Sequence, residues 1–419
     1  MPFYIVYFAQ FHEEFRLPEL ESLAVLENVK YSFSKDDYSL DSPFFKIELE
    51  SDADAARLAR RSILIRKIYE LWGEGETYEK VHEQVKSKPE RWDAYMQDSF
   101  KFTVDAFGMT ITAKRQVEII NSFGYLGFQG DIDMKTPQQK YGLLEDWGCQ
   151  RPSTGLKYVY MGRLVARGNR DLVKTYNLKK RKYLGTTSMD AELSLIMANQ
   201  ALATDAKMVY DPFVGTGSFL FTCAHFGAYT MGSDIDGRQI RGKSPESSIQ
   251  GNVAQYNLQS RVVDTLVFDV CHHPWRCTEW LDAIVTAPYG VRAGAKTLGR
   301  REGKKYSPLA HDGPRAPKEE GYPPTRPYEM SEVVSDLLTF AARHLRVGGR
   351  LVYWLPTVVD DYSVTDIPSH AGMVLLSNSE QNFGQWSRRL ITMEKTRWIS
   401  MTTHRKTLRP WVIICLEKR

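Results

Sequence analysis

The sequence contains no long hydrophobic run. A membrane-spanning helix is indicated by about 18 or more consecutive apolar residues, and no segment of this chain approaches that length. The first residues also lack the basic segment that precedes the apolar stretch of a secretory signal. We therefore expect neither a membrane span nor secretion, and we predict a cytoplasmic protein.

Cysteine is scarce in the chain. The five cysteines are Cys149, Cys223, Cys271, Cys277 and Cys415. No two of them have the C-x-x-C spacing of a zinc knuckle or a redox pair. The stretch from Cys271 to Cys277 also holds two histidines, but it lacks the paired ligands of a structural zinc site. We expect buried thiols in a reducing compartment and no bound metal.

Neither sign of charge dominates the composition. The formal net charge is +4 at pH 7 and the sequence pI is about 8.6. A nucleic-acid partner would therefore be bound by local basic patches and not by overall charge. The 419 residues, 42% of them hydrophobic, exceed the usual size of one domain, so we expect two or three.

The N-terminal residues alternate between strand and helix patterns. We predict strands at Phe3–Ala9, Phe44–Glu48 and Ile63–Leu71 and helices at Leu17–Val29 and Ala53–Ser62. This β-α-β-α-β order is typical of a small α+β, ferredoxin-like unit, to which we assign residues 1–90. A helix at Tyr78–Lys88 leads into a second unit at residues 91–170, with strands at Phe100–Phe107 and Tyr158–Val165 and a helix at Lys114–Phe123.

Basic residues gather around the end of the second unit and the linker at residues 171–187. Those that we predict to contact RNA are Arg163, Arg167, Arg170, Lys174, Lys180 and Arg181. A run of this kind is also compatible with a solvated face. Tyrosines interleave with the basic residues, which favours RNA because bases stack on aromatic rings. Arg292 and Arg300, in a long stretch without periodicity from Gly290 to Pro327, are two further candidates.

The pattern changes after Gly185. A strong helix is predicted at Ser188–Ala203, with Thr187 or Ser188 as N-cap. Strands then alternate with helices, at Met208–Tyr210, Tyr229–Ser233, Val262–Phe268, Ala283–Val285, Arg350–Leu355, Gly372–Leu376 and Trp411–Leu416. This alternation predicts an α/β domain at residues 188–419 with a parallel, doubly wound sheet.

The strongest local motif is Asp211–Ser218, which follows an apolar strand and opens a helix. Its glycines allow a ligand to approach the backbone, and the helix N-terminus supplies unpaired N–H donors. The motif lacks the full G-x-G-x-x-G of dinucleotide sites, which favours the adenosyl cofactor of methyltransferases. The residues that we predict to bind it here are Asp211, Phe213, Gly215, Gly217 and Ser218.

Two more acidic residues follow the next two predicted strands. Asp234, with Ile235 beside it, is placed to accept hydrogen bonds from both ribose hydroxyls, as the acid of dinucleotide folds does. Asp236 is the alternative, although it could instead interact with a helix dipole. Asp269, at the end of the third strand, suits the adenine amino group. Three acids at successive strand ends indicate a cofactor site more strongly than any one of them.

A second chemical motif is the turn Thr286-Ala287-Pro288-Tyr289. Proline fixes φ and leaves the preceding carbonyl free to accept from an amino group, while a tyrosine ring can stack on a base. Acceptors that draw on the amino hydrogens of guanine would localise the nitrogen lone pair for attack on a methyl sulfonium. We therefore predict Thr286, Ala287, Pro288 and Tyr289 as the catalytic residues.

Several segments together resemble one family. Residues 181–193, Asp211–Ser218, Gly232–Asp236 and Ala287–Arg292 are similar to the THUMP-domain tRNA guanosine N2-methyltransferases, in particular to the eukaryotic catalytic subunits that act on guanosine 10. The opening residues 4–24 are also similar to that family. The resemblance therefore covers nearly the whole chain.

The resemblance implies a fold, a cofactor and partners. Residues 1–90 would be an N-terminal ferredoxin-like domain, residues 91–170 a THUMP module that binds tRNA, and residues 188–419 a Rossmann-like class I methyltransferase domain with a mostly parallel, seven-stranded sheet. The cofactor would be S-adenosylmethionine. A small zinc-binding activator protein would complete a heterodimer by pairing a β-strand with the catalytic domain.

One departure from the family pattern leaves alternatives open. The family turn reads Asp or Asn, then Pro-Pro-Tyr, whereas this chain has Thr286 at the acid when it is matched backwards from Tyr289, or lacks one residue. A neutral acceptor bonds about half as strongly as an anionic one. A cofactor-binding but catalytically silent tRNA-binding subunit is therefore the main alternative. A DNA adenine N6-methyltransferase shares the chemistry but leaves the N-terminal half without a role.

Overall fold

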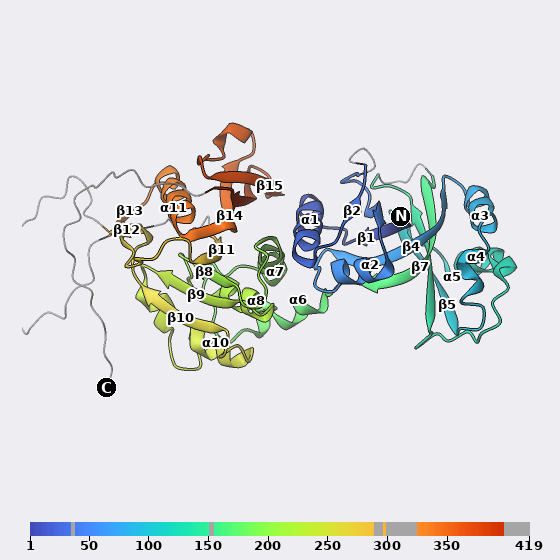
Figure 1. Ribbon diagram of the computed structural model, residues 1–419, viewed down its shortest axis with the longest axis horizontal. Coiled ribbons are helices and arrows are strands. Elements are labelled where there is room, and N and C mark those ends of the chain that lie inside the picture. Colours follow the sequence, from blue (N-terminus) through green and yellow to red (C-terminus); the bar gives the residue numbers. More distant parts are fainter. Residues whose placement is uncertain (35–37, 151–154, 289–295, 299–324, 398–419) are drawn as a thin grey trace, which may run out of the picture.

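The computed structural model describes residues 1–34, 38–150, 155–288, 296–298 and 325–397. Two halves lie side by side, each built on a seven-stranded sheet, with α1 (Arg16–Glu27) and α6 (Asp171–Thr175) between them (Figure 1). Tyr289, Arg292, Arg300 and the predicted strand Trp411–Leu416 lie outside the described residues. Of the helices that are described, none is both long and apolar enough to cross a membrane.

The N-terminal sheet has the strand order β2-β3-β1-β4-β7-β6-β5. Its strands are β1 Phe3–Phe8, β2 Tyr31–Ser32, β3 Phe44–Leu49, β4 Ile65–Gly75, β5 Phe100–Phe107, β6 Gln139–Asp146 and β7 Tyr158–Arg167. Strands β5 and β6 are parallel and all other pairs are antiparallel. Because β4 pairs with both β1 and β7, one sheet runs across residue 90, and the domain boundary placed there stays a prediction.

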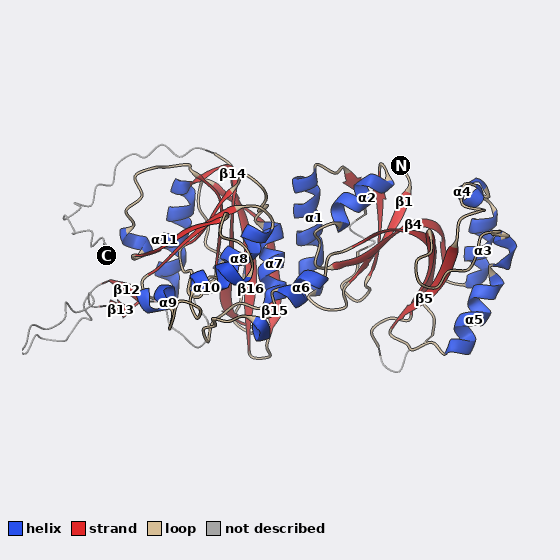
Figure 2. Ribbon diagram, turned by 90° about the horizontal axis from the view of Figure 1, so that it is seen from below, coloured by secondary structure: helices blue, strands red, loops and turns tan. Residues whose placement is uncertain are grey.

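Helices cover this sheet in two groups. Strand β1 packs its Tyr4, Val6 and Phe8 into a core with α1 and with α2 (Asp52–Ala59). The second group is α3 (Tyr78–Lys86), α4 (Glu90–Asp93) and α5 (Ala113–Ser122), which lie together at the end of the molecule far from the C-terminal half (Figure 2). Trp72 and Tyr141 are central to the core beneath this second group.

The C-terminal sheet has the order β10-β9-β8-β11-β14-β16-β15. Its strands are β8 Met208–Asp211, β9 Tyr229–Asp234, β10 Val262–Val267, β11 Leu281–Thr286, β14 Leu345–Val358, β15 Met373–Asn382 and β16 Trp386–Lys395. The first five are parallel and β16 is antiparallel to both of its neighbours. The helices are α7 Ala191–Gln200, α8 Ser218–His225, α9 Gly237–Arg241, α10 Ile249–Gln255 and α11 Met330–His344. The predicted mostly parallel, doubly wound architecture is confirmed.

Two local predictions in this half need correction. Strand β16 was not predicted, because arginines normally indicate an exposed segment. In the structure the guanidinium of Arg388 lies 4.3 Å from the ring centroid of Trp354, so the arginine is packed against the neighbouring strand. Helix α7 begins three residues later than predicted, and its N-cap is Asp190, whose side chain accepts from the backbone N–H of Glu192 at 2.8 Å. Ser188, one of the two predicted caps, has another role described below.

A buried polar cluster joins the two halves. The Glu19 carboxylate on α1 accepts from the backbone N–H of Ile63 at 2.9 Å and from the Asn199 amide on α7 at 2.6 Å. Arg61 in turn donates to the Asn199 Oδ1 at 2.8 Å. Arg350 of β14 donates to the Ser22 hydroxyl of α1 at 3.0 Å. Breaking such buried bonds leaves desolvated groups unpaired, so the halves are held in one relative orientation.

Two neighbouring histidines lie in the C-terminal half, His344 buried and His273 half-buried. His273 and His344 bring their Nε2 atoms within 3.4 Å, and the Nδ1 of His344 lies 2.9 Å from the carbonyl of Cys277. Burial lowers the pKa of each imidazole from 6.5 to about 4. Between about pH 6.5 and pH 4 both rings are therefore neutral in the folded protein, whereas in the unfolded chain they take up protons.

This pair predicts an acid-sensitive stability. Between about pH 6.5 and pH 4 the unfolded chain binds more protons than the folded one, so stability present above that window is lost as the pH falls through it. We expect the free energy of unfolding, measured by denaturant titration, to fall from about pH 7 to about pH 5. His273→Phe should reduce that slope by removing one titrating group, and an unchanged slope would contradict the assignment.

Candidate active site

Four polar side chains meet at one edge of the C-terminal sheet. Asp211, Asp234 and Thr286 end β8, β9 and β11, and Asp269 follows β10. These strands are parallel and adjacent, so their carboxyl ends lie at the same edge. In open α/β sheets this edge is where ligands bind. The structure thus brings together the acids and the turn that the sequence predicted.

Asp211 is buried and only partly satisfied. It is 1% exposed, and its Oδ1 accepts from the Thr286 hydroxyl at 2.7 Å and from the backbone N–H of Phe213 at 3.0 Å. Its Oδ2 is buried with no hydrogen-bond partner among the described residues. Burial raises the pKa of the carboxyl to about 7, against the lowering effect of the two bonds. A desolvated acceptor without a partner is costly, so the site is suited to a donor or a cation from a ligand.

Asp234 holds the glycine loop that follows β8. Its Oδ2 accepts from the backbone N–H of Gly215 and its Oδ1 from that of Asp236, both at 2.9 Å. Gly215 and Gly217 have φ of +50° and +86°, a region that other residues rarely adopt. Burial raises the pKa of Asp234, and its backbone hydrogen bonds oppose that effect. The carboxylate keeps further lone pairs beyond these two bonds, which is compatible with the predicted ribose contact.

Asp269 has a structural task that the sequence did not reveal. Its Oδ2 accepts from the Thr297 hydroxyl at 2.7 Å and from the backbone N–H of Leu298 at 2.8 Å. These residues belong to β12 (Lys296–Leu298), which pairs with β13 (Thr325–Pro327). Its Oδ1 accepts from the backbone N–H of Cys271 at 3.1 Å. Asp269 therefore anchors this hairpin, and the adenine contact stays a prediction that relies on the remaining capacity of Oδ1.

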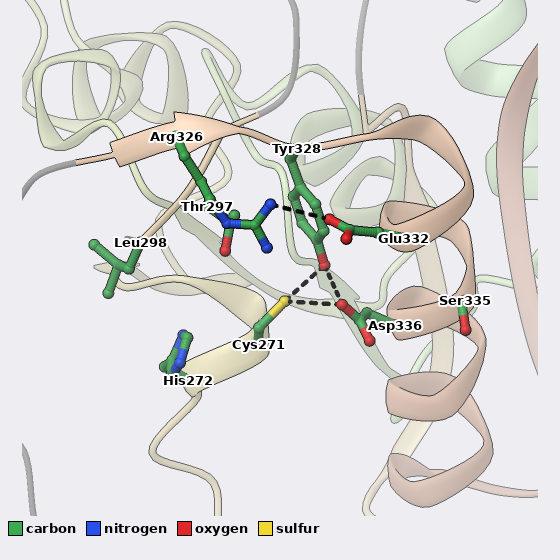
Figure 3. A pocket seen from close by; sticks show the side chains of 9 residues that line it. All are labelled: Cys271, His272, Thr297, Leu298, Arg326, Tyr328, Glu332, Ser335 and Asp336. Carbon is green, nitrogen blue, oxygen red and sulfur yellow. Dashed lines mark hydrogen bonds and ion pairs between the residues drawn. The ribbon is translucent and has the colours of Figure 1, made fainter. Parts of the chain in front are cut away.

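A cavity of about 500 Å³ lies beside this hairpin (Figure 3). Within it, the Tyr328 hydroxyl donates to Asp336 at 2.5 Å and lies 2.6 Å from the Sγ of Cys271. Burial raises the pKa of the Cys271 thiol to about 12, so it stays protonated. In the described part of the chain no three His, Cys, Asp or Glu side chains are grouped to hold a metal.

The catalytic turn differs from its prediction at Thr286. The side chain is 0% exposed, and its hydroxyl hydrogen is donated to Asp211. In this structure the hydroxyl is directed to Asp211, which differs from the open acceptor that the sequence predicted, and its role toward a substrate amino group stays a prediction. Ala287 is partly exposed and Pro288 is buried, and the main-chain carbonyl of Ala287 is the other acceptor in the predicted turn.

Two of the predicted RNA contacts also need correction. Arg163 is buried and bonded to Asp52 and Glu70, at 2.5 and 2.9 Å. Arg181 is buried beneath the glycine loop, where its Nη1 donates to Ser218 at 2.8 Å. Neither guanidinium can reach a phosphate. The prediction was wrong for these two residues because the residues that bury them are distant in the sequence, so the local sequence does not indicate their burial.

The other basic residues of that run differ in whether their charge is free to contact an RNA phosphate. Arg170 is half-buried and donates to Glu192 at 3.0 Å. Lys174 is exposed in an ion pair with Asp171, a contact that contributes little at the surface. Arg167 and Lys180 are exposed. Arg167, Lys174 and Lys180 therefore remain candidates for phosphate contacts.

The linker also contributes to the site, which the sequence did not indicate. The Ser188 hydroxyl lies 2.8 Å from that of Thr216 in the glycine loop and accepts from the backbone N–H of Gly185 at 3.0 Å. Gly185 approaches the same loop so closely that a Cβ there would lie 3.0 Å from the Thr216 methyl. Residues 185–188 thus form one wall of the candidate cofactor site.

The chain is similar to several known proteins. The Tmrp11 THUMP N-terminal domain family matches residues 2–170. The chain is 41% identical to a tRNA (guanine(10)-N(2))-methyltransferase of Schizosaccharomyces pombe over 94% of this chain and 90% of that protein. It is 36% identical to the Homo sapiens enzyme of the same name, over 94% and 88%. A crystal structure of TrmN from Thermus thermophilus aligns with 94% of this chain and 99% of its own, at 14% identity and a TM-score of 0.44.

Identity at this level over nearly the full length of both chains shows that the chain belongs to the tRNA (guanine(10)-N(2))-methyltransferase family.

Proposed function

We propose that this protein transfers a methyl group from S-adenosylmethionine to the exocyclic N2 of guanosine 10 in tRNA. The observation that carries the proposal is the buried 2.7 Å hydrogen bond between Asp211 and Thr286. Asp211 begins the glycine loop and Thr286 begins the catalytic turn. One contact therefore fixes a cofactor-binding segment and a substrate-binding segment against each other, as group transfer between them requires.

The residues around the glycine loop fit the adenosyl cofactor. The N-terminus of α8 offers backbone N–H groups, and Asp211 offers an unpartnered acceptor. The N–H groups of Gly215 and Gly217 are donated to Asp234 and Val214, so these glycines serve by letting a ligand approach the backbone closely. In this proposal Asp234 contacts the ribose and Ile235 the adenine face, and Phe213, Ser218 and Asp269 contribute further contacts. When bound, the cofactor supplies an electrophilic methyl sulfonium, and these residues orient it.

The turn residues act on the guanine. The carbonyl of Ala287, preceding Pro288, accepts an amino hydrogen and draws the nitrogen lone pair out of the ring. Tyr289 stacks on the base. A carbonyl is a weaker acceptor than the carboxylate of the family turn, and this difference favours one second candidate, a cofactor-binding subunit that binds tRNA without methylating it.

A small zinc-binding activator protein is the expected partner. Two edges of the C-terminal sheet are open to strand pairing, β10 and β15. The β15 edge is partly covered by the N-terminal half, since the Ser379 hydroxyl donates to the Glu14 carbonyl at 2.9 Å. On β10, Val263 and Val267 are each 52% exposed. These exposed apolar side chains on an edge strand support β10 as the docking strand.

The first test is methyl transfer itself. The wild-type chain with its activator, labelled cofactor and unmodified tRNA should give a product that nuclease mapping assigns to guanosine 10. Tyr289→Ala should lower turnover about tenfold to more than a hundredfold, because a stacked base contributes about 1–3 kcal/mol. Tyr229→Ala, at an exposed tyrosine of β9, is the matched control. Complete absence of product from the wild type would decide for the silent subunit.

The second test addresses the predicted ribose acid. Asp234→Ala removes the carboxylate that bonds Gly215 and is expected to hold two hydroxyls, so affinity for S-adenosylhomocysteine should fall by about a hundredfold or more, as expected from two bonds to a charged group. Calorimetry measures this affinity. Asp264→Ala, which removes an exposed carboxylate on β10, should bind as the wild type does. If Asp234→Ala and Asp264→Ala both bind S-adenosylhomocysteine as tightly as the wild type does, Asp234 does not contact the ribose.

The third test concerns the tRNA contacts. If Arg167, Lys174 and Lys180 bond phosphates, a triple glutamine variant should reduce the slope of log affinity against log salt by about 2 to 3, at roughly 0.7 to 0.9 per phosphate. Filter binding or fluorescence anisotropy at several salt concentrations measures the slope.

A matched triple variant at Lys30, Lys88 and Lys243 removes three exposed charges elsewhere. It should leave the slope closer to the wild-type value. The same slope for both triples would assign Arg167, Lys174 and Lys180 to solvated surface.

A further inference from the structure

The β15–β16 hairpin ends in two stacked aromatic side chains. The ring centroids of Phe383 and Trp386 lie 4.2 Å apart, and the angle between the ring planes is 14°. Phe383 is 45% exposed and Trp386 is partly exposed. Aromatic side chains left in water forgo the apolar burial that stabilises most residues of this kind. The stacked pair is therefore available to a further ring from a ligand.

An arginine beside the stacked pair has no close counter-charge. The guanidinium carbon of Arg388 lies 5.5 Å from the ring centroid of Phe383, and its Nε donates to the side-chain oxygen of Gln381 at 2.8 Å. No carboxylate of the described residues lies within 4.0 Å of its nitrogens. Burial lowers the pKa of Arg388 to about 10, and Asp190 opposes that effect from a greater distance. A guanidinium in such a position is suited to an anionic group of a ligand, and phosphate is one that arginine binds well.

The β15–β16 hairpin projects past the catalytic turn at the same edge of the sheet. Tyr353 of β14 pairs with Thr286, the last residue of β11. Val358, five residues further along β14, pairs with Trp386. At about 3.3 Å per residue the stacked pair lies about 16 Å beyond the turn, and β16 is two strand spacings, about 10 Å, to its side. Successive nucleotides of a duplex strand are about 3.4 Å apart along the axis, so the stacked pair is too distant to contact the base that is methylated.

The N-terminal half presents a similar combination of side chains beside this hairpin. The Ser379 hydroxyl of β15 donates to the Glu14 carbonyl of the short helix η1 (Glu13–Phe15) at 2.9 Å. Just before that helix, Phe11 is 43% exposed, and its ring centroid lies 4.6 Å from the guanidinium carbon of Arg170. An exposed aromatic ring with an arginine beside it therefore lies on each side of the junction between the halves. Such combinations are typical of surfaces that bind unpaired nucleic-acid strands.

We propose that Phe383, Trp386 and Arg388 bind a nucleotide that flanks guanosine 10 in the tRNA, with its base stacked on the rings and its phosphate beside the guanidinium. This rests on the proposed function, because it assumes that guanosine 10 lies at the catalytic turn. Stacking on aromatic rings tolerates any base, so the contact adds affinity and orientation but little sequence specificity. A base bound in this way has left its stack in the RNA. The enzyme therefore holds the tRNA around the target in an opened form.

The test is a double-mutant cycle between protein and RNA. Filter binding measures affinity for intact tRNA and for tRNAs with one abasic nucleotide at each of the three positions on either side of guanosine 10. Phe383→Ala should lower the affinity for intact tRNA by about 5- to 100-fold, as expected for the loss of one stacked base. For the tRNA whose missing base is the stacked one, the wild type should bind no more tightly than Phe383→Ala, because the interaction is already absent.

The matched control is Tyr229→Ala. Tyr229 is 41% exposed at the start of β9, at the opposite edge of the sheet, and the guanidinium carbon of Arg261 lies 5.1 Å from its ring centroid. This variant should bind each tRNA as the wild type does. Comparing two proteins on the same RNA cancels any effect of the abasic site on the RNA itself.

The proposal is overturned if Phe383→Ala binds intact tRNA as the wild type does, or if the ratio between the two proteins is the same for every abasic tRNA. If Phe383→Ala instead loses affinity for the activator protein and keeps its affinity for tRNA, the hairpin tip is a protein interface. Should Phe383→Ala not bind S-adenosylhomocysteine as the wild type does, Trp386→Leu repeats the cycle in its place. A wild-type chain that shows the coupling but transfers no methyl group would overturn the proposed function and not the stacking contact.

Discussion

The hydrogen bond between Asp211 and Thr286 is the constraint on which the active site depends. Both side chains are buried at the ends of adjacent parallel strands, so neither can move without disturbing the sheet. The bond lowers the pKa of a carboxyl that burial raises to about 7, and it thereby favours the charged form that a cofactor ammonium would need. It also uses the Thr286 hydroxyl hydrogen within the protein. Loop and turn are therefore fixed in one geometry before any ligand arrives.

Buried hydrogen bonds also hold the two halves of the molecule in a fixed orientation. Asn199 of α7 reaches into the N-terminal half and bonds both Glu19 and Arg61, while Arg350 of β14 bonds Ser22. These groups are desolvated and mutually satisfied, so separating the halves would expose several of them unpaired. A substrate held by the N-terminal half would consequently be presented to the active site at a fixed distance, which a flexible linker could not ensure.

The sequence was informative wherever function depends on local chemistry. The glycines of the Asp211–Ser218 motif had to be glycines because Gly215 and Gly217 adopt positive φ, and the acids at successive strand ends were recognisable from the strand pattern alone. It misled wherever a side chain is defined by partners distant in the chain. Arg163 and Arg181 belong to a run that resembles an RNA-binding surface, yet both are buried by residues that contribute no signal nearby. Strand β16 was missed for the same reason, since Trp354 covers Arg388 from another strand.

By itself, then, the sequence determined the alternation of strands and helices that opens each half, the parallel part of the C-terminal sheet, the glycine loop and the resemblance to the family. These follow from periodicity, turn chemistry and spacing, which act over a few residues. Only the tertiary structure decided which polar groups are satisfied. It paired Thr286 with Asp211, bound Asp269 to the Thr297 hydroxyl, and buried Arg181 against Ser218. The partners of these side chains are distant in the sequence and meet only when the chain folds. A polar residue that is buried must then find a hydrogen-bond partner, whereas the same residue type at the surface is satisfied by water.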